Sequence, residues 1–183
     1  MLQSAIILAV TAVYCVQAQT KFFLYTSDSQ SVPEEITEHN SIWGSSAYNN
    51  LIVLIHGHRG SARTPFNTLI KDNILRFQES HNVLVVDWEK DASYSYSTAS
   101  ARVPFVARDL ENLLIRFISS SVLVSNCHLV GFGLGAHIAG IANRWFSEQY
   151  GYTEGVGRIT GLDPSGILAV STESTRGASR SLS

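Results

Sequence analysis

Three glycines at alternate positions, Gly131, Gly133 and Gly135, form the part of the chain that comes nearest to a catalytic motif. Their spacing fits the strand-to-helix turn G-x-S-x-G, in which a central serine attacks an acyl carbon. Such a serine works because the turn holds its oxygen away from the backbone and a histidine accepts its proton. Here the central residue is Gly133, which has no side-chain atom that can attack. The sequence therefore has the two outer glycines of an acyl-transfer turn but lacks the nucleophile between them.

The same glycines also fit a motif of a different enzyme class. Gly131-x-Gly133-x-x-Ala136 matches the dinucleotide-binding pattern G-x-G-x-x-G/A, which follows a strand and opens a helix. That pattern needs an acidic residue at the end of a second strand about 20 residues further on. Glu154 lies in a glycine-rich segment instead, and only one further strand is expected after the motif. We therefore expect no nicotinamide cofactor.

Apolar runs and helical periodicity alternate along the chain on both sides of the glycine turn. Strands are expected at residues 21–25, 51–55, 83–86, 127–130 and 158–162, with a possible further strand near 35–36. The first of them is expected at an edge of the sheet. Helices are expected from residue 65 to about 77, over 103–118 and over about 135–148. This alternation predicts an α/β fold, a mostly parallel sheet with helices on both faces.

The first expected helix has a clear start signal and a clear apolar pattern. Thr64 stands at the capping position and Pro65 in the first turn, where a missing N–H does no harm. Apolar residues then recur at steps of three and four. They are Phe66, Leu69, Ile70, Ile74 and Phe77. This spacing is typical of an amphipathic helix.

Both ends of the chain differ in character from the region between them. The first 19 residues carry no charged side chain, and their apolar run is too short to span a bilayer as a permanent helix. Val16-Gln17-Ala18 suits a signal peptidase, so we expect residues 1–18 to be a signal peptide of a secreted, extracellular product. A short anchor or a buried helix is the alternative. The domain would then occupy residues 19–166, and the serine-rich residues 167–183 would be a disordered tail.

Charge and metal-binding residue types exclude several classes of function. The 13 basic and 15 acidic residues nearly balance, and the basic ones are scattered, so no nucleic-acid partner is expected. Four histidines, His56, His58, His128 and His137, do not have the spacing of metal ligands, so no metal is expected. Cys127 precedes an apolar run and is expected to be a small buried side chain.

Five segments resemble, in the same order, those of secreted lipases of the pancreatic-lipase-like group, an α/β-hydrolase family that includes insect lipases and phospholipases. These segments are residues 22–26, 54–58, 85–88, 128–140 and 159–164. The resemblance implies an α/β-hydrolase fold whose C-terminal part is missing, which makes 19–166 a truncated lipase-type domain. It also implies carboxylic ester hydrolysis of triglyceride or phospholipid, no cofactor, and a lipid or lipid-water interface as the partner.

The resemblance also assigns roles to individual residues. Gly133 occupies the nucleophile position, Asp163 matches the triad acid, and the backbone N–H groups of His58 and Leu134 match the oxyanion hole. From local sequence alone, Asp163 is as readily an Asp-Pro turn residue. The triad histidine would follow the acid, yet no histidine follows His137, which we expect to be a hydrogen-bonded core residue. Losing the serine or the histidine typically costs about 10⁶ in turnover, so the chain as written is predicted to be inactive.

Three explanations of a lipase sequence without its serine stay open. The chain is a non-catalytic protein of this fold that binds lipid or another partner, as the related yolk proteins of flies suggest. Alternatively, it is an active lipase whose sequence is incomplete or incorrect, or a truncated product that folds poorly. The sequence specifies neither the ligand nor the oligomeric state.

Overall fold

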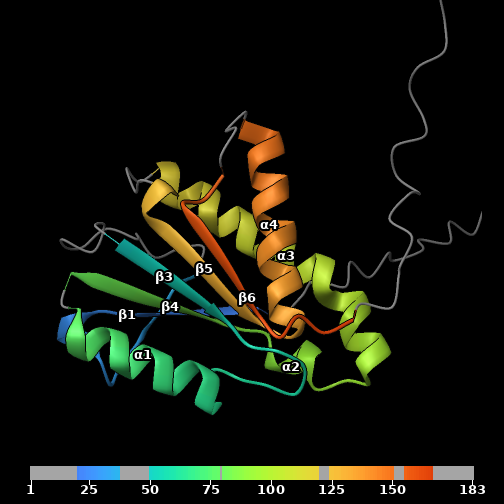
Figure 1. Cartoon of the computed structure of the whole chain (residues 1–183), viewed down its shortest axis with the longest axis horizontal. Coiled ribbons are helices and arrows are strands. Elements are labelled where there is room, and N and C mark those ends of the chain that lie inside the picture. Colours follow the sequence, from blue (N-terminus) through green and yellow to red (C-terminus); the bar gives the residue numbers. More distant parts are fainter. Residues whose placement is uncertain (1–19, 38–49, 79, 120–123, 151–154, 167–183) are drawn as a thin grey trace, which may run out of the picture.

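A computed structural model of the chain describes residues 20–37, 50–78, 80–119, 124–150 and 155–166 (Figure 1). Its strands are β1 (Lys21–Tyr25), β2 (Glu34–Glu35), β3 (Asn50–Ile55), β4 (His81–Asp87), β5 (Cys127–Phe132) and β6 (Arg158–Leu162). Its helices are α1 (Pro65–Phe77), α2 (Glu89–Ala92), α3 (Tyr96–Ser119) and α4 (Leu134–Tyr150). The expected signal peptide, the expected tail and Glu154 lie outside the described residues.

The strands form one six-stranded sheet in the order β2-β1-β4-β3-β5-β6. The four strands β4, β3, β5 and β6 are parallel, whereas β1 runs antiparallel to β4 and β2 runs antiparallel to β1. The predicted mostly parallel sheet is confirmed. The prediction that residues 21–25 form an edge strand is wrong, because the short strand β2 pairs along the outer side of β1.

Helices cover both faces of the sheet, with α1 on one face and α3 and α4 on the other (Figure 1). Successive residues of the central strand β3 serve the two cores in turn: Val53 packs with the α3 and α4 side, and Leu54 with the α1 side. Both are fully buried. This explains why β3 reads as an unbroken apolar run rather than an alternating one. Cys127 is buried as expected, and burial raises the pKa of its thiol to about 12.

Three of the five apolar positions predicted for α1, Phe66, Ile70 and Ile74, pack against the core, but the other two do not. Leu69 and Phe77 are 62% and 70% exposed, whereas Leu75 is buried together with two polar residues, Asn67 and Lys71. Polar partners outside the helix explain why two polar residues are buried: Asn67 donates to the Ser61 carbonyl, and Lys71 donates to the carbonyl of Gln30. Thr64 is the N-cap residue, as predicted, but its side chain does not cap the helix, because its hydroxyl donates to the Ser61 carbonyl instead.

Helix α3 begins at Tyr96 and not at Val103, where its apolar periodicity starts. The extra turns carry small residues, and Ala99 and Ser100 are nonetheless buried against the fold. The hydroxyl of Ser95 accepts a hydrogen bond from the Thr98 N–H at 3.4 Å and caps the start. No helix within the described residues has the length and apolar character needed to cross a bilayer.

Candidate active site at the carboxyl edge of the sheet

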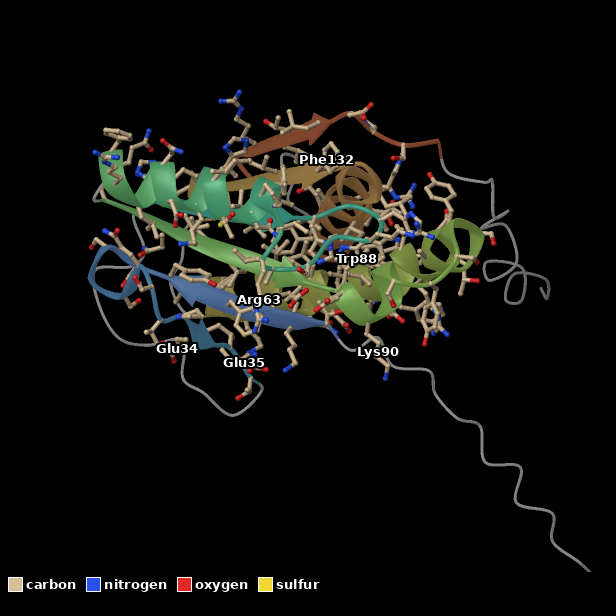
Figure 2. The ribbon with its side chains drawn as sticks, turned by 90° about the horizontal axis from the view of Figure 1, so that it is seen from below. Glu34, Glu35, Arg63, Trp88, Lys90 and Phe132 are labelled. Atoms are coloured by element: carbon tan, nitrogen blue, oxygen red, sulfur yellow. The ribbon has the colours of Figure 1, made fainter. Side chains whose placement is uncertain are left out.

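Four parallel strands end at the same edge of the sheet, and a residue with potential chemistry follows each of them. His56 follows β3, Trp88 follows β4, Gly133 follows β5 and Asp163 follows β6. Trp88 and the last residue of β5, Phe132, are labelled in Figure 2. In the sheet, β4 lies on one side of β3 and β5 lies on the other, so the order of the strands reverses at β3. Open parallel sheets bind their ligands at such a switch point.

The glycine turn between β5 and α4 has the backbone shape that the sequence motif predicts. Gly133 is buried with φ +58°, a left-handed conformation that few residues other than glycine adopt. Its N–H donates to the Leu162 carbonyl at 3.0 Å, which ties the turn to the end of β6. A Cβ on Gly131 would lie 2.3 Å from the Gly135 carbonyl oxygen, so the turn closes tightly on itself.

The segment after β3 packs directly against this turn. The Gly57 Cα is 3.7 Å from the point that a Cβ on Gly133 would occupy. The next residue is His58, and its backbone N–H donates to no backbone carbonyl among the described residues. The same holds for Leu134, whose N–H lies in the first turn of α4 and has no partner within the helix. Neither backbone group assigned to an oxyanion hole thus has a backbone acceptor in the part of the chain that the structure describes.

The His58 side chain holds its own loop in place. Its Nε2 lies 2.9 Å from the Tyr94 carbonyl oxygen, and its ring meets the Tyr96 ring edge-on with centroids 5.3 Å apart. The following residue, Arg59, has φ +57°, and its N–H donates to the Ala92 carbonyl at 2.9 Å. These contacts fix the direction of the loop that carries the His58 N–H.

Asp163 lies at the end of β6, on the same edge as Gly133. It is exposed, has φ +44°, and makes no side-chain hydrogen bond or ion pair within the described part of the chain. No histidine ring contacts it there. His137 is half-buried, and its Nε2 lies 2.5 Å from the Ser165 carbonyl oxygen, so it is a hydrogen-bonded residue of the turn region.

The structure also joins three residues that sequence reasoning did not group. His56 Nε2 lies 3.3 Å from Asp87 Oδ1, and the His56 ring stacks on Trp88 with centroids 5.5 Å apart. The indole Nε1–H of Trp88 donates to the His56 carbonyl at 2.8 Å. This cluster links the ends of β3 and β4. Its only signal in the sequence is that polar residues directly follow two buried apolar strands.

Asp87 gives the cluster a defined dependence on pH. Burial by itself raises the pKa of Asp87, but hydrogen bonding and charge attraction from His56, with the N–H groups of Glu89 and Ala62, hold that pKa below its usual 3.8. A carboxylate with a lowered pKa stabilises the fold above its unfolded-state pKa, and this contribution is lost as the pH falls through the folded-state value.

We therefore expect Asp87→Asn to lower the free energy of unfolding by about 1.5 to 3 kcal/mol at pH 7, because a charged hydrogen-bond acceptor is lost. The difference from wild type should shrink as the pH falls below about 3.8, when the wild-type carboxylate also takes up its proton. Urea unfolding at a series of pH values measures both effects. Glu34→Gln, at an exposed position of β2, is the matched control and should be nearly neutral.

No three His, Cys, Asp or Glu side chains within the described ranges are placed to hold a metal ion together.

Comparison with known proteins places the chain in a family. The sequence model of the Lipase family matches residues 8–181. Lipase member H-A of Xenopus laevis is 32% identical over 157 residues, covering 82% of this chain and 32% of that protein. Phospholipase A1 member A of Rattus norvegicus is 31% identical over 154 residues, and pancreatic triacylglycerol lipase of Equus caballus is 34% identical over 152, each covering 81% of this chain and 32% of the relative.

The chain thus spans about a third of the length of these curated relatives. Among solved structures, a phospholipase/carboxylesterase from Dyadobacter fermentans DSM 18053 is similar with a TM-score of 0.49 at 12% identity, covering 84% of this chain and 66% of that one. The family match extends over nearly all of the chain, including the glycine turn and the ends of the four parallel strands. The chain therefore belongs to the pancreatic-lipase-like family of lipases.

Proposed function

We propose that this chain is a secreted, non-catalytic lipase-family domain that binds lipid esters at the carboxyl edge of its sheet. The observation that carries the proposal is the glycine turn. This turn has the backbone geometry of a nucleophile-bearing turn, with Gly133 at φ +58°, but it has no side-chain oxygen at that position. Because both assigned oxyanion donors are backbone groups, the loss of the serine side chain leaves them in place.

The same site supports ligand binding without efficient turnover. An ester carbonyl accepts hydrogen bonds in its ground state, so the N–H groups of His58 and Leu134 can hold it without any nucleophile. Without the serine and the histidine, the remaining catalysis is limited to about 10³ to 10⁴ over water. Secretion rests on the uncharged apolar segment at the start of the chain.

A second candidate is an active lipase of which these residues are one part. Asp163 favours it, because this carboxylate lies exposed at the site edge without a partner among the described residues. In this case a segment beyond these 183 residues supplies the histidine, and the natural residue 133 is serine. Sequencing the transcript across codon 133 and past codon 183 separates the two candidates.

The decisive activity test uses p-nitrophenyl butyrate, a soluble ester, and a tributyrin emulsion. We expect the chain to bind the emulsion in a flotation assay and to release p-nitrophenol at a rate that a serine-directed organophosphonate does not change. We also expect Gly133→Ser to raise the rate by less than about tenfold, because a triad serine without its histidine is as impaired as one that is missing. Turnover by the wild type that the phosphonate abolishes would refute the proposal.

A further inference from the structure

The Ser165 side chain lies next to the space that a side chain at position 133 would occupy. The Oγ atom of Ser165 lies 3.1 Å from the point that a Cβ on Gly133 would occupy. A Cβ–Oγ bond is about half that length, so the Ser165 hydroxyl stands beside the volume that a serine hydroxyl at position 133 would fill. Ser165 is half-buried, and its hydroxyl has no hydrogen-bond partner within the described residues. The hydroxyl is therefore free to donate to a ligand.

Hydrogen bonds from two helices hold the segment that carries this hydroxyl. The Ser165 carbonyl oxygen lies 2.5 Å from Nε2 of His137 on α4. The next carbonyl, that of Gly166, accepts a hydrogen bond from the hydroxyl of Tyr96 at the start of α3. On the other side, the Gly133 N–H donates to the Leu162 carbonyl. The backbone on both sides of the Ser165 side chain is therefore held in place by the fold.

Apolar side chains lie next to this polar position. Phe132 and Leu162 are paired across β5 and β6 and are 41% and 40% exposed. The Phe132 ring stacks on Phe66 with centroids 5.5 Å apart and lies 3.2 Å from the point that a Cβ on Gly57 would occupy. Gly57 in turn adjoins the space above Gly133. A ligand with a polar carbonyl and an aliphatic chain matches this arrangement.

We propose that the Ser165 hydroxyl contacts the ligand, donating a hydrogen bond to the carbonyl of a carboxylic ester whose acyl chain lies on Phe132 and Leu162. This inference rests on the proposed function, because it assumes that the edge binds esters. Ser165 acts here as a specificity-determining residue, and no covalent bond to it is involved. The ester carbonyl enters the space beside Gly133, which a serine side chain would otherwise occupy.

The test compares two ligands that differ in the carbonyl group, methyl hexanoate and methyl hexyl ether, titrated against the 183-residue chain by NMR. We expect the wild type to bind the ester more tightly than the ether, because the Ser165 hydroxyl and the N–H groups of His58 and Leu134 can all donate to its carbonyl. Ser165→Ala should reduce this preference about three- to tenfold, as the loss of one net hydrogen bond implies, and Ser165→Thr, which keeps a hydroxyl, should retain most of it. Ser80→Ala is the control, because Ser80 precedes β4 at the opposite edge of the sheet.

The outcomes separate the two proposals. Equal ester preference in the wild type and in Ser165→Ala would overturn the role of Ser165 and leave the proposed function standing. If the wild type binds neither probe, the proposed function fails and this inference fails with it. An unchanged thermal unfolding transition in Ser165→Ala shows that any lost preference reflects the hydroxyl and not the fold.

Discussion

Replacing Gly135 with alanine is expected to lower the free energy of unfolding by about 3 kcal/mol or to prevent folding altogether. The added Cβ would lie 2.2 Å from the Ile55 carbonyl oxygen and 2.6 Å from that of His56. Both are main-chain atoms at the end of the central strand β3, so neither can move aside as a flexible side chain would. Urea unfolding followed by circular dichroism measures the loss.

Gly140 provides the matched control for this substitution. It lies in α4, like Gly135, but a Cβ at Gly140 would meet nothing within 4 Å. Gly140→Ala is therefore expected to raise the free energy of unfolding by about 0.5 to 1 kcal/mol, because alanine favours the helix over glycine. Equal effects of the two substitutions would show that α4 does not pack against β3 as described.

Trp88→Ala is expected to lower the free energy of unfolding by about 3 to 5 kcal/mol. The indole is fully buried, stacks on His56, and donates its Nε1–H to the His56 carbonyl. Its removal leaves a cavity between the ends of β3 and β4 and an acceptor without a partner. Guanidinium unfolding at pH 7 measures the effect.

The control for Trp88 is Phe105→Ala, at an aromatic residue of α3 that is 48% exposed. We expect a change of at most about 1 kcal/mol there, since much of that ring already contacts water. A loss at Trp88 no larger than the loss at Phe105 would contradict the packing of the His56, Asp87 and Trp88 cluster.

The strands could be predicted because their burial leaves a direct mark on the sequence. A strand such as β3 faces a core on both sides, so its residues 51–55 are all apolar, and the alternation with helices then predicts parallel pairing. The apolar pattern of α1 predicted only part of the face that this helix buries. Its buried face includes Asn67 and Lys71, and their partners, Ser61 and Gln30, lie outside the helix. Periodicity records apolar burial and carries no information on such polar contacts.

The candidate site likewise has one part that could be predicted from the sequence and another that could not. The glycine turn could be predicted from local sequence, because its residues are contiguous and its left-handed backbone requires glycine at position 133. The approach of Ser165 to this turn could not, because it depends on how the segment after β6 is held by His137 and Tyr96. The same is true of the pairing of His56 with Asp87, which are separated by 31 positions in the chain.

The backbone conformation of Gly133 affects the energetic cost of other residues at position 133. A serine there would adopt a left-handed conformation that costs about 1 to 3 kcal/mol, and its Cβ would crowd the Ser165 hydroxyl. That cost would fall on any variant of this chain that carries serine at position 133. Stability alone therefore favours glycine at this turn, whatever chemistry the site performs.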